Sequence, residues 1–133
     1  MFLLRKCSKW VGTFAVLAGG IVFWGYSLSA GGAELPPELA FLAPLLADQE
    51  AFVKTIRDYH NEQRNLAREE REAAGEAHKQ GDAEKARELA TAARERMLLV
   101  RKGYEIGLAR FGDNARLHNY YGELLYDEFG EKS

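Results

Sequence analysis

Histidines are the residues of this sequence that come closest to a metal-binding pattern. His60 stands in the stretch HNEQR, which looks like the start of a zinc-binding helix. That motif needs a glutamate directly after the first histidine and a second histidine four residues on, because two imidazoles one turn apart share the metal. Asn61 and Arg64 hold those positions here. We therefore expect no metal at His60, and structural or solvated roles for His78 and His118.

A run of alternating charges is the second candidate for chemistry. It comprises Arg64, Arg68, Glu69, Glu70, Arg71 and Glu72. Neighbouring carboxylates can act as general acid and base, but opposite charges three and four residues apart on a helix more simply form exposed ion pairs. No glycine-rich phosphate loop, nucleophile elbow or paired-cysteine motif occurs in the sequence. The sequence thus predicts no enzyme, no metal site and no cofactor.

The charges divide the chain unevenly. Arg5, Lys6 and Lys9 are the only charges before Glu34, so 15 of the 18 basic residues and all 20 acidic residues lie beyond residue 33. That part carries about −5, whereas a nucleic-acid binder needs a basic face that displaces phosphate counterions. We therefore expect no nucleic-acid partner.

An uncharged segment follows the three basic residues. Residues 10–30 read WVGTFAVLAGGIVFWGYSLSA, and about 20 apolar residues cross a hydrocarbon core of roughly 30 Å. Residues 1–30 are therefore predicted to be a signal anchor with one transmembrane helix, whose interfaces hold Trp10, Trp24 and Tyr26. Basic residues stay on the cytoplasmic side. This predicts a single-pass inner (plasma) membrane protein with a cytoplasmic N-terminus and an extracytoplasmic domain, periplasmic in a bacterial envelope.

A cleaved signal peptide is the alternative for the same segment. Small residues in SLSAGGA suit a cleavage site, and cleavage would release a secreted protein. The apolar run exceeds the roughly 7 to 15 residues of the apolar core (h-region) of a usual signal peptide, which favours the uncleaved anchor. Cys7, the single cysteine, lies before the apolar run, so it suits neither an internal disulfide nor a lipoprotein cleavage site.

The exported part is predicted to be all-α, with a linker over residues 31–47 and a helical domain over residues 48–133. In the linker, Pro37 opens a short interfacial helix and Pro44 ends it.

Two long helices are predicted over about residues 48–79 and 83–111, because apolar residues recur there at steps of four and three. Between them, Gly81 can take a left-handed conformation and Asp82 can cap the second helix, so the chain reverses into an antiparallel hairpin. A bend near residues 94–96 would instead divide the second helix. The first stripe is Phe52, Ile56, Tyr59, Gln63, Leu66, Ala73 or Ala74, and Ala77; the second is Ala86, Ala90, Ala93, Met97, Val100, Tyr104, Gly107 and Phe111. Alanines then meet near the turn and aromatic rings meet at the open end.

A third, shorter helix is predicted over about residues 115–129. Residues 112–114 (GDN) repeat the stop-and-start chemistry of the first turn, and Gly130 closes the helix. Its apolar residues are Leu117, Tyr120, Tyr121, Leu124, Leu125 and Phe129. We expect this helix to pack on the base of the hairpin, formed by Tyr104, Leu108 and Phe111.

Residues 103–130, GYEIGLARFGDNARLHNYYGELLYDEFG, resemble the junction between two tetratricopeptide repeats. In that register Gly107 takes the small-residue position of helix B, Gly112 the usual proline position and His118 the tryptophan position. Tyr121, Gly122 and Leu125 then match the leucine, glycine and tyrosine positions of the next helix A. Residues 77–86, AHKQGDAEKA, look like the turn inside a repeat.

The resemblance implies protein binding through a groove or an exposed helix face, without a cofactor. Two departures matter, since the second helix is longer than a usual helix B and the sequence ends after one helix A. Repeat arrays need about three units to bury a continuous core. Either an elongated hairpin buries the third helix itself, or the open side docks another copy or a partner, or the chain is truncated.

The third helix carries more aromatic residues than one side can bury. Core packing is expected to take Tyr121, Leu124 and Leu125, which leaves His118, Tyr120, Tyr126 and Phe129 as predicted partner-binding residues. The first functional hypothesis is a membrane-anchored protein-binding or scaffold module. The second is a small accessory subunit of a membrane complex, held mainly through its transmembrane helix. The partner in either case is another protein, a second copy or a membrane complex.

Overall fold

The computed structural model describes residues 35–131. The predicted transmembrane span and its interface residues Trp10, Trp24 and Tyr26 lie outside the described residues. Across residues 35–131, none of the helices combines the length and the apolar composition that crossing a bilayer would take.

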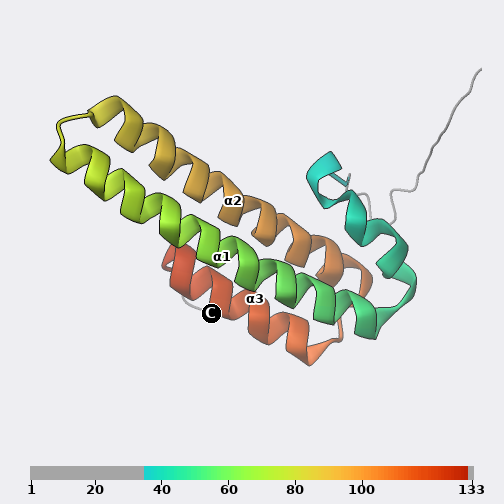
Figure 1. Ribbon diagram of the computed structural model, residues 1–133. Coiled ribbons are helices and arrows are strands. Elements are labelled where there is room, and N and C mark those ends of the chain that lie inside the picture. The colour runs from blue at the N-terminus through green and yellow to red at the C-terminus, as the bar shows by residue number, and fades with distance from the viewer. Residues whose placement is uncertain (1–34, 132–133) are drawn as a thin grey trace, which may run out of the picture. The chain divides into compact units, whose positions relative to one another are not determined.

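The all-α prediction is confirmed. The described chain forms a 3-10 helix, η4 (Pro37–Ala47), and three α-helices, α1 (Gln49–Lys79), α2 (Ala83–Arg110) and α3 (Ala115–Phe129) (Figure 1). No strand occurs between residues 35 and 131. The helix α2 is continuous over 28 residues, so the alternative bend near residues 94–96 is absent.

Two capping aspartates and one glycine set the start of α1 and the turn between α1 and α2. The Asp48 side chain accepts a hydrogen bond from the backbone N–H of Ala51 at 3.2 Å, and that of Asp82 accepts from Lys85 at 3.1 Å. Gly81 lies between α1 and α2 with φ of +83°, a conformation that favours glycine. The predicted reversal at Gly81 and Asp82 is therefore confirmed.

The turn between α2 and α3 differs from the first turn. Asn114 caps α3, because its side-chain oxygen accepts from the Leu117 N–H at 3.0 Å. Gly112 does not adopt positive φ; within residues 35–131 only Gly81 and Gly130 do. The chain instead turns with the Asn114 N–H donating to the carbonyl of Phe111 at 3.0 Å. Gly130, with φ of +68°, ends α3 as predicted.

The hairpin core has the predicted gradient from small to aromatic residues. Alanines Ala67, Ala77 and Ala93 are buried in the half nearer the turn. At the open end the Phe52 and Phe111 rings pack with centroids 5.6 Å apart. The buried hydrophobic residues of the structure are Leu39, Leu42, Phe52, Val53, Ile56, Ala67, Ala77, Ala93, Met97, Val100, Tyr104, Ile106, Leu117 and Leu124.

A single stripe does not describe the buried side of α1. Val53, His60 and Ala67 are also buried, at steps of seven beside the predicted stripe. They lie there because α1 is covered by α2 and also by α3, whereas the predicted stripe provides for one neighbour. On α2, Gly103 and Ile106 are buried in addition to the predicted residues, and the predicted stripe member Ala90 is exposed.

The helix η4 does not end at Pro44, so that prediction is wrong. It runs to Ala47, with Pro44 inside it. A 3-10 helix has three residues per turn, so side chains three apart stand in one row. Leu39 and Leu42 are fully buried in such a row, and Leu45 follows half-buried. This row anchors η4 to the hairpin, and one missing proline N–H does not outweigh it.

The helices η4 and α3 cover different faces of the hairpin (Figure 1). On the η4 side, Leu42 approaches Gly103 closely. On the α3 side, Tyr121 packs on Tyr104 with ring centroids 6.1 Å apart. The third helix therefore lies on the base of the hairpin, as predicted.

Candidate functional site

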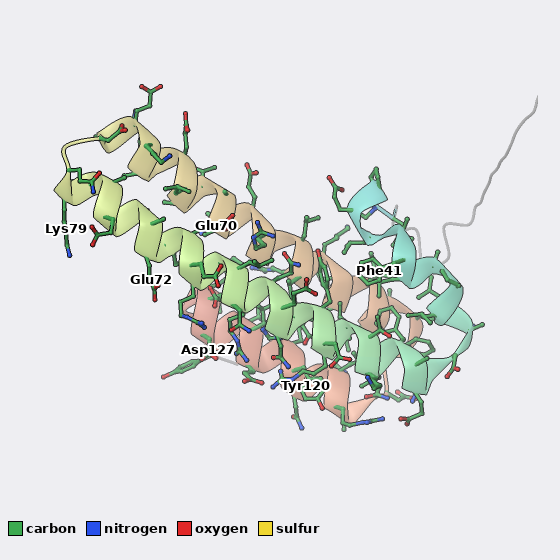
Figure 2. The ribbon with its side chains drawn as sticks, viewed as in Figure 1. Phe41, Glu70, Glu72, Lys79, Tyr120 and Asp127 are labelled. Carbon is green, nitrogen blue, oxygen red and sulfur yellow. The ribbon has the colours of Figure 1, made fainter. Side chains whose placement is uncertain are left out.

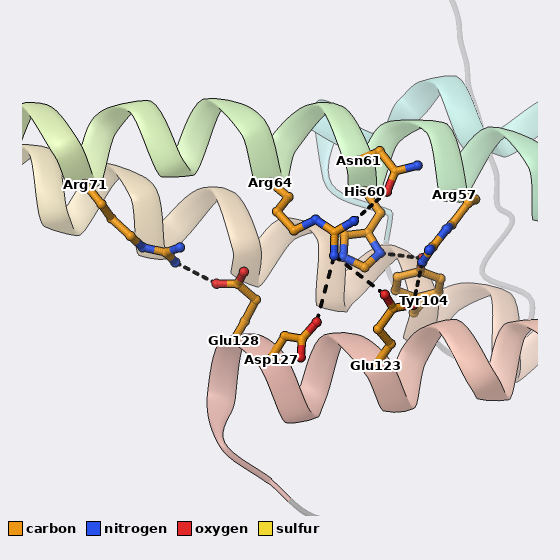
Figure 3. Close-up of polar contacts among 9 residues, drawn as sticks. All are labelled: Arg57, His60, Asn61, Arg64, Arg71, Tyr104, Glu123, Asp127 and Glu128. Carbon is orange, nitrogen blue, oxygen red and sulfur yellow. Dashed lines mark hydrogen bonds and ion pairs between the residues drawn. The ribbon is translucent and has the colours of Figure 1, made fainter.

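Ion pairs fasten α3 to α1 along one flank. Arg57 of α1 donates to Glu123 of α3 at 2.9 Å, and Arg64 lies 3.7 Å from Glu123 and 3.9 Å from Asp127 (Figure 3). Seven residues after Arg64 on α1, Arg71 forms an ion pair with Glu128 of α3 at 2.7 Å. The three arginines are spaced seven residues apart, so they form one row facing α3.

This row changes the interpretation of the charged run at residues 64–72. Only Arg68 and Glu72, 4.0 Å apart and both exposed, form the expected pair within one helix. Glu70 instead accepts two hydrogen bonds from Arg96, at 3.1 Å and 2.8 Å, across the hairpin. The expectation of a wholly solvated face is therefore only partly right, because three of these six charges, Arg64, Glu70 and Arg71, contact another helix.

The opposite flank of α3 contacts α2 through aromatic rings and arginines. The Tyr121 hydroxyl donates to Glu105 at 3.1 Å. The guanidinium groups of Arg101 and Arg94 lie 5.0 Å and 5.8 Å from the centre of the Phe129 ring. A guanidinium group over an aromatic ring is attracted by the ring's π-electrons, so these two arginines hold Phe129 against α2.

A buried histidine lies where α1 faces α2 and α3. His60 is 1 % exposed, and its Nδ1 lies 2.8 Å from the Tyr104 hydroxyl (Figure 3). Its Nε2 is buried and has no hydrogen-bond partner among the described residues. Sequence reasoning did not place His60 in the core, although its position four residues after Ile56 on the apolar side of α1 carried that signal.

Burial controls the protonation of this pair. Burial first, and then the guanidinium groups of Arg64 and Arg57, lower the pKa of His60 from 6.5 to about 4, against a smaller opposing effect of Glu123 and Asp127. Burial also raises the pKa of the Tyr104 hydroxyl above its usual 10.0. Both groups are uncharged at neutral pH, which suits a structural contact inside the hairpin. Between residues 35 and 131, no three His, Cys, Asp or Glu side chains are grouped to hold a metal.

The four predicted partner-binding residues do not form one cluster. Tyr120 is half-buried on the α1 flank, with the Arg57 guanidinium 4.3 Å above its ring. His118 is exposed, with Nε2 2.7 Å from the carbonyl oxygen of Gly112. Tyr126 is 64 % exposed, and Phe129 is half-buried on the α2 flank. Tyr120 and Phe129 thus stand on opposite flanks of α3.

A continuous stripe nevertheless runs along α3 at the border between its α2 flank and solvent. His118, Gly122, Leu125 and Phe129 follow one another at steps of four, three and four, and Tyr126 lies beside them. We call these five residues the α3 outer surface. Each is exposed or half-buried, and apart from its chain neighbours and the α3 backbone no described atom lies within 4 Å of where a Cβ of Gly122 would stand.

Two further observations extend this surface beyond the predicted residues. Leu125 was expected in the core, yet it is half-buried and Leu117 takes the buried place. On α2, Leu98 is 40 % exposed, one turn after Arg94 and one turn before Arg101. Because both arginines reach Phe129, Leu98 continues the apolar surface from α3 onto α2.

The fold and this surface define a class of protein, a small all-α hairpin with a third helix that keeps an apolar outer face. Comparison of the chain with protein-family models, with curated proteins and with solved structures gives no match.

Proposed function

We propose that this chain is a membrane-anchored, protein-binding module whose α3 outer surface receives a helix of another protein. The observation that carries the proposal is a mid-helix glycine with open space above it, bordered by half-exposed aromatic residues. Gly122 is that glycine, and Tyr126 is 64 % exposed beside it. Clustered exposed aromatic residues are typical of protein interfaces.

A helix suits this surface better than a loop does. Glycine inside a helix costs about 1 kcal/mol relative to alanine, and no described residue of the chain uses the space it leaves. Without a side chain at Gly122, a second helix can approach the α3 backbone closely, with Tyr126 and Phe129 packing at its sides. The resemblance to a tetratricopeptide repeat supports the same arrangement, since α3 corresponds there to a helix A, which packs against other helices in a repeat array.

The membrane anchor is the second part of the proposal. The uncharged residues 10–30, preceded by Arg5, Lys6 and Lys9, support a single span with the helical unit on the extracytoplasmic side.

Replacing both Tyr126 and Phe129 by alanine is expected to weaken partner capture at least tenfold and to leave helical circular dichroism unchanged. Both side chains lie outside the buried core, and interface aromatics are frequent hot spots. A photoreactive residue at exposed Asn119 of the full-length chain in membranes would capture the partner. The captured protein would be identified by mass spectrometry, and its affinity for each variant measured.

A pair of glycine variants provides the matched test. Gly122→Ala and Gly75→Ala are the same change at two mid-helix positions with nothing within 4 Å, so both should stabilise the fold equally. Only Gly122→Ala should weaken capture. Loss of helicity in the Tyr126 and Phe129 variant would make these residues part of the core. Unchanged capture, combined with its loss when residues 10–30 are replaced by an unrelated span, would show the accessory-subunit function instead.

A further inference from the structure

The helix η4 is apolar on the side that faces away from the hairpin. Its inner row, Leu39 and Leu42, is fully buried. Seven residues of η4 are exposed: Pro37 and the charged Glu38 in its first turn, and after them five apolar residues, Ala40, Phe41, Ala43, Pro44 and Ala47. We call these five residues the η4 outer face. Glu38 is the only charged residue within η4.

Phe41 is the largest part of this face. Its ring packs against Tyr59 of α1, with centroids 5.1 Å apart, yet 41 % of the residue remains exposed (Figure 2). Since α3 covers a different face of the hairpin, no other described helix covers the η4 outer face. An element that is apolar on both sides buries only one side against its own domain, so the other side favours a second apolar surface.

The position of η4 in the chain indicates which surface that is. The uncharged run ends at Ala33, and only residues 34–36 separate it from η4. Three extended residues reach about 11 Å at most. The headgroup layer on one side of a bilayer is roughly 5 to 8 Å thick. A chain that leaves the membrane near Ala33 therefore begins η4 within or just above the headgroup layer.

We propose that the η4 outer face lies in the headgroup and acyl boundary of the membrane that residues 10–30 cross. This inference rests on the membrane anchor of the proposed function. An element of this kind lies in the interface plane, with an aromatic ring at headgroup depth and small apolar residues beside it. The hairpin is then held at the lipid surface by η4, and α3, which packs on a different face, stays free for a partner.

The charge next to the η4 outer face fits a lipid surface. Arg110 is exposed, and its Nε donates to the carbonyl oxygen of Leu46 near the end of η4 at 2.9 Å. The remaining guanidinium N–H groups are donors for lipid phosphate, which arginine binds well. A cation at the edge of an apolar face is the usual composition of a membrane-surface helix.

The test uses the full-length chain with Cys7→Ser and one new cysteine. Ala43→Cys places a fluorescent label on the η4 outer face, and Ala90→Cys places the same label on an exposed alanine of α2 as the matched control. Each labelled chain is reconstituted into phosphatidylcholine vesicles containing lipids spin-labelled near the headgroup. We expect the Ala43 label to be quenched by the spin-labelled lipid, and to be several-fold slower than the Ala90 label to react with aqueous dithionite. The control corrects for copies facing the vesicle lumen.

Each outcome separates the two proposals. A chain that does not float with the vesicles overturns the membrane anchor itself. A chain that floats, but whose Ala43 label reacts with dithionite as fast as the Ala90 label, overturns the η4 proposal alone. A label protected from dithionite yet not quenched by the lipid also overturns it, because protein then covers the face. Phe41→Asp should expose the Ala43 label and leave flotation unchanged.

Discussion

Replacing Gly107 by alanine is expected to lower the free energy of unfolding by about 2 kcal/mol, although alanine is the better helix former. A Cβ at this position would collide with the Phe52 ring, with Cζ only 2.9 Å away. Phe52 is fully buried, and the Phe111 ring packs on it, so the ring has no room to move aside. Overpacking of this kind typically costs about 1 to 3 kcal/mol, more than the roughly 1 kcal/mol that alanine contributes to helix stability.

Chemical unfolding followed by circular dichroism measures this effect. The control is Gly122→Ala, the same change inside α3, where nothing lies within 4 Å of the added methyl group. That variant is expected to gain about 0.5 to 1 kcal/mol. The two changes therefore have opposite signs. A gain in both would mean that Phe52 does not lie over Gly107, and the register of the hairpin described above would be wrong.

A second substitution distinguishes a steric clash from a general loss of flexibility. Phe52→Leu removes the ring that meets Gly107, at a cost of its own in the core. If the clash is the cause, Gly107→Ala should destabilise the Phe52→Leu background much less than the natural chain. Additive effects would contradict this, since residues in contact couple and distant ones do not.

The ends of the helices could be predicted from the sequence because local chemistry sets them. Asp82, Gly81 and Gly130 act on backbone groups within a few residues, so their roles do not depend on the rest of the fold. The end of η4 could not be predicted this way. Pro44 is a helix-ending signal locally, but a row of leucines spaced three apart binds the hairpin and carries the helix past it.

The contacts that α1 makes with α3 could not be predicted from the local sequence pattern. Apolar spacing predicted Phe52 and Ile56 in the core because they face α2, and both are buried. Arg57 and Arg64 face α3, whose Glu123 lies 66 residues beyond Arg57 in the chain, and polar residues give no apolar signal for that side. The candidate site was likewise predicted only in part. Tyr126 was predicted to be a partner-binding residue and is exposed, whereas the open space above Gly122 is visible only in the structure.

Acid is expected to destabilise this fold through His60. The pKa of His60 is lowered to about 4 in the folded chain, from 6.5 without the fold. Below pH 6.5 the unfolded chain therefore binds a proton that the folded chain does not. The free energy of unfolding consequently decreases as the pH is lowered. The contribution is fully present above about pH 7 and is lost progressively between pH 6.5 and pH 4. A difference of about 2.5 pKa units corresponds to about 3 kcal/mol.

The charged groups around His60 set the size of this effect. Arg64 and Arg57 oppose protonation, whereas Glu123 and Asp127 favour it. The hydrogen bond from Arg57 lowers the pKa of Glu123, so this carboxylate stays ionised over most of the same range. Protonating His60 would also place a third positive charge between two arginines in the contact between α1 and α3 (Figure 3).

The measurement is urea unfolding of the full-length chain in detergent at several pH values between 4.5 and 7.5, with an NMR titration of the His60 ring. His60→Gln removes the titrating group and keeps a polar side chain beside the Tyr104 hydroxyl, so this variant should be less stable at pH 7 but nearly independent of pH. His78→Gln, at an exposed histidine of the hairpin turn, is the matched control and should keep the full slope. A His60 titration midpoint near 6.5, or a slope that persists in His60→Gln, would show that the acid sensitivity arises elsewhere. If the prediction holds, one buried imidazole with an unpartnered Nε2 makes the contact between the hairpin and α3 dependent on pH.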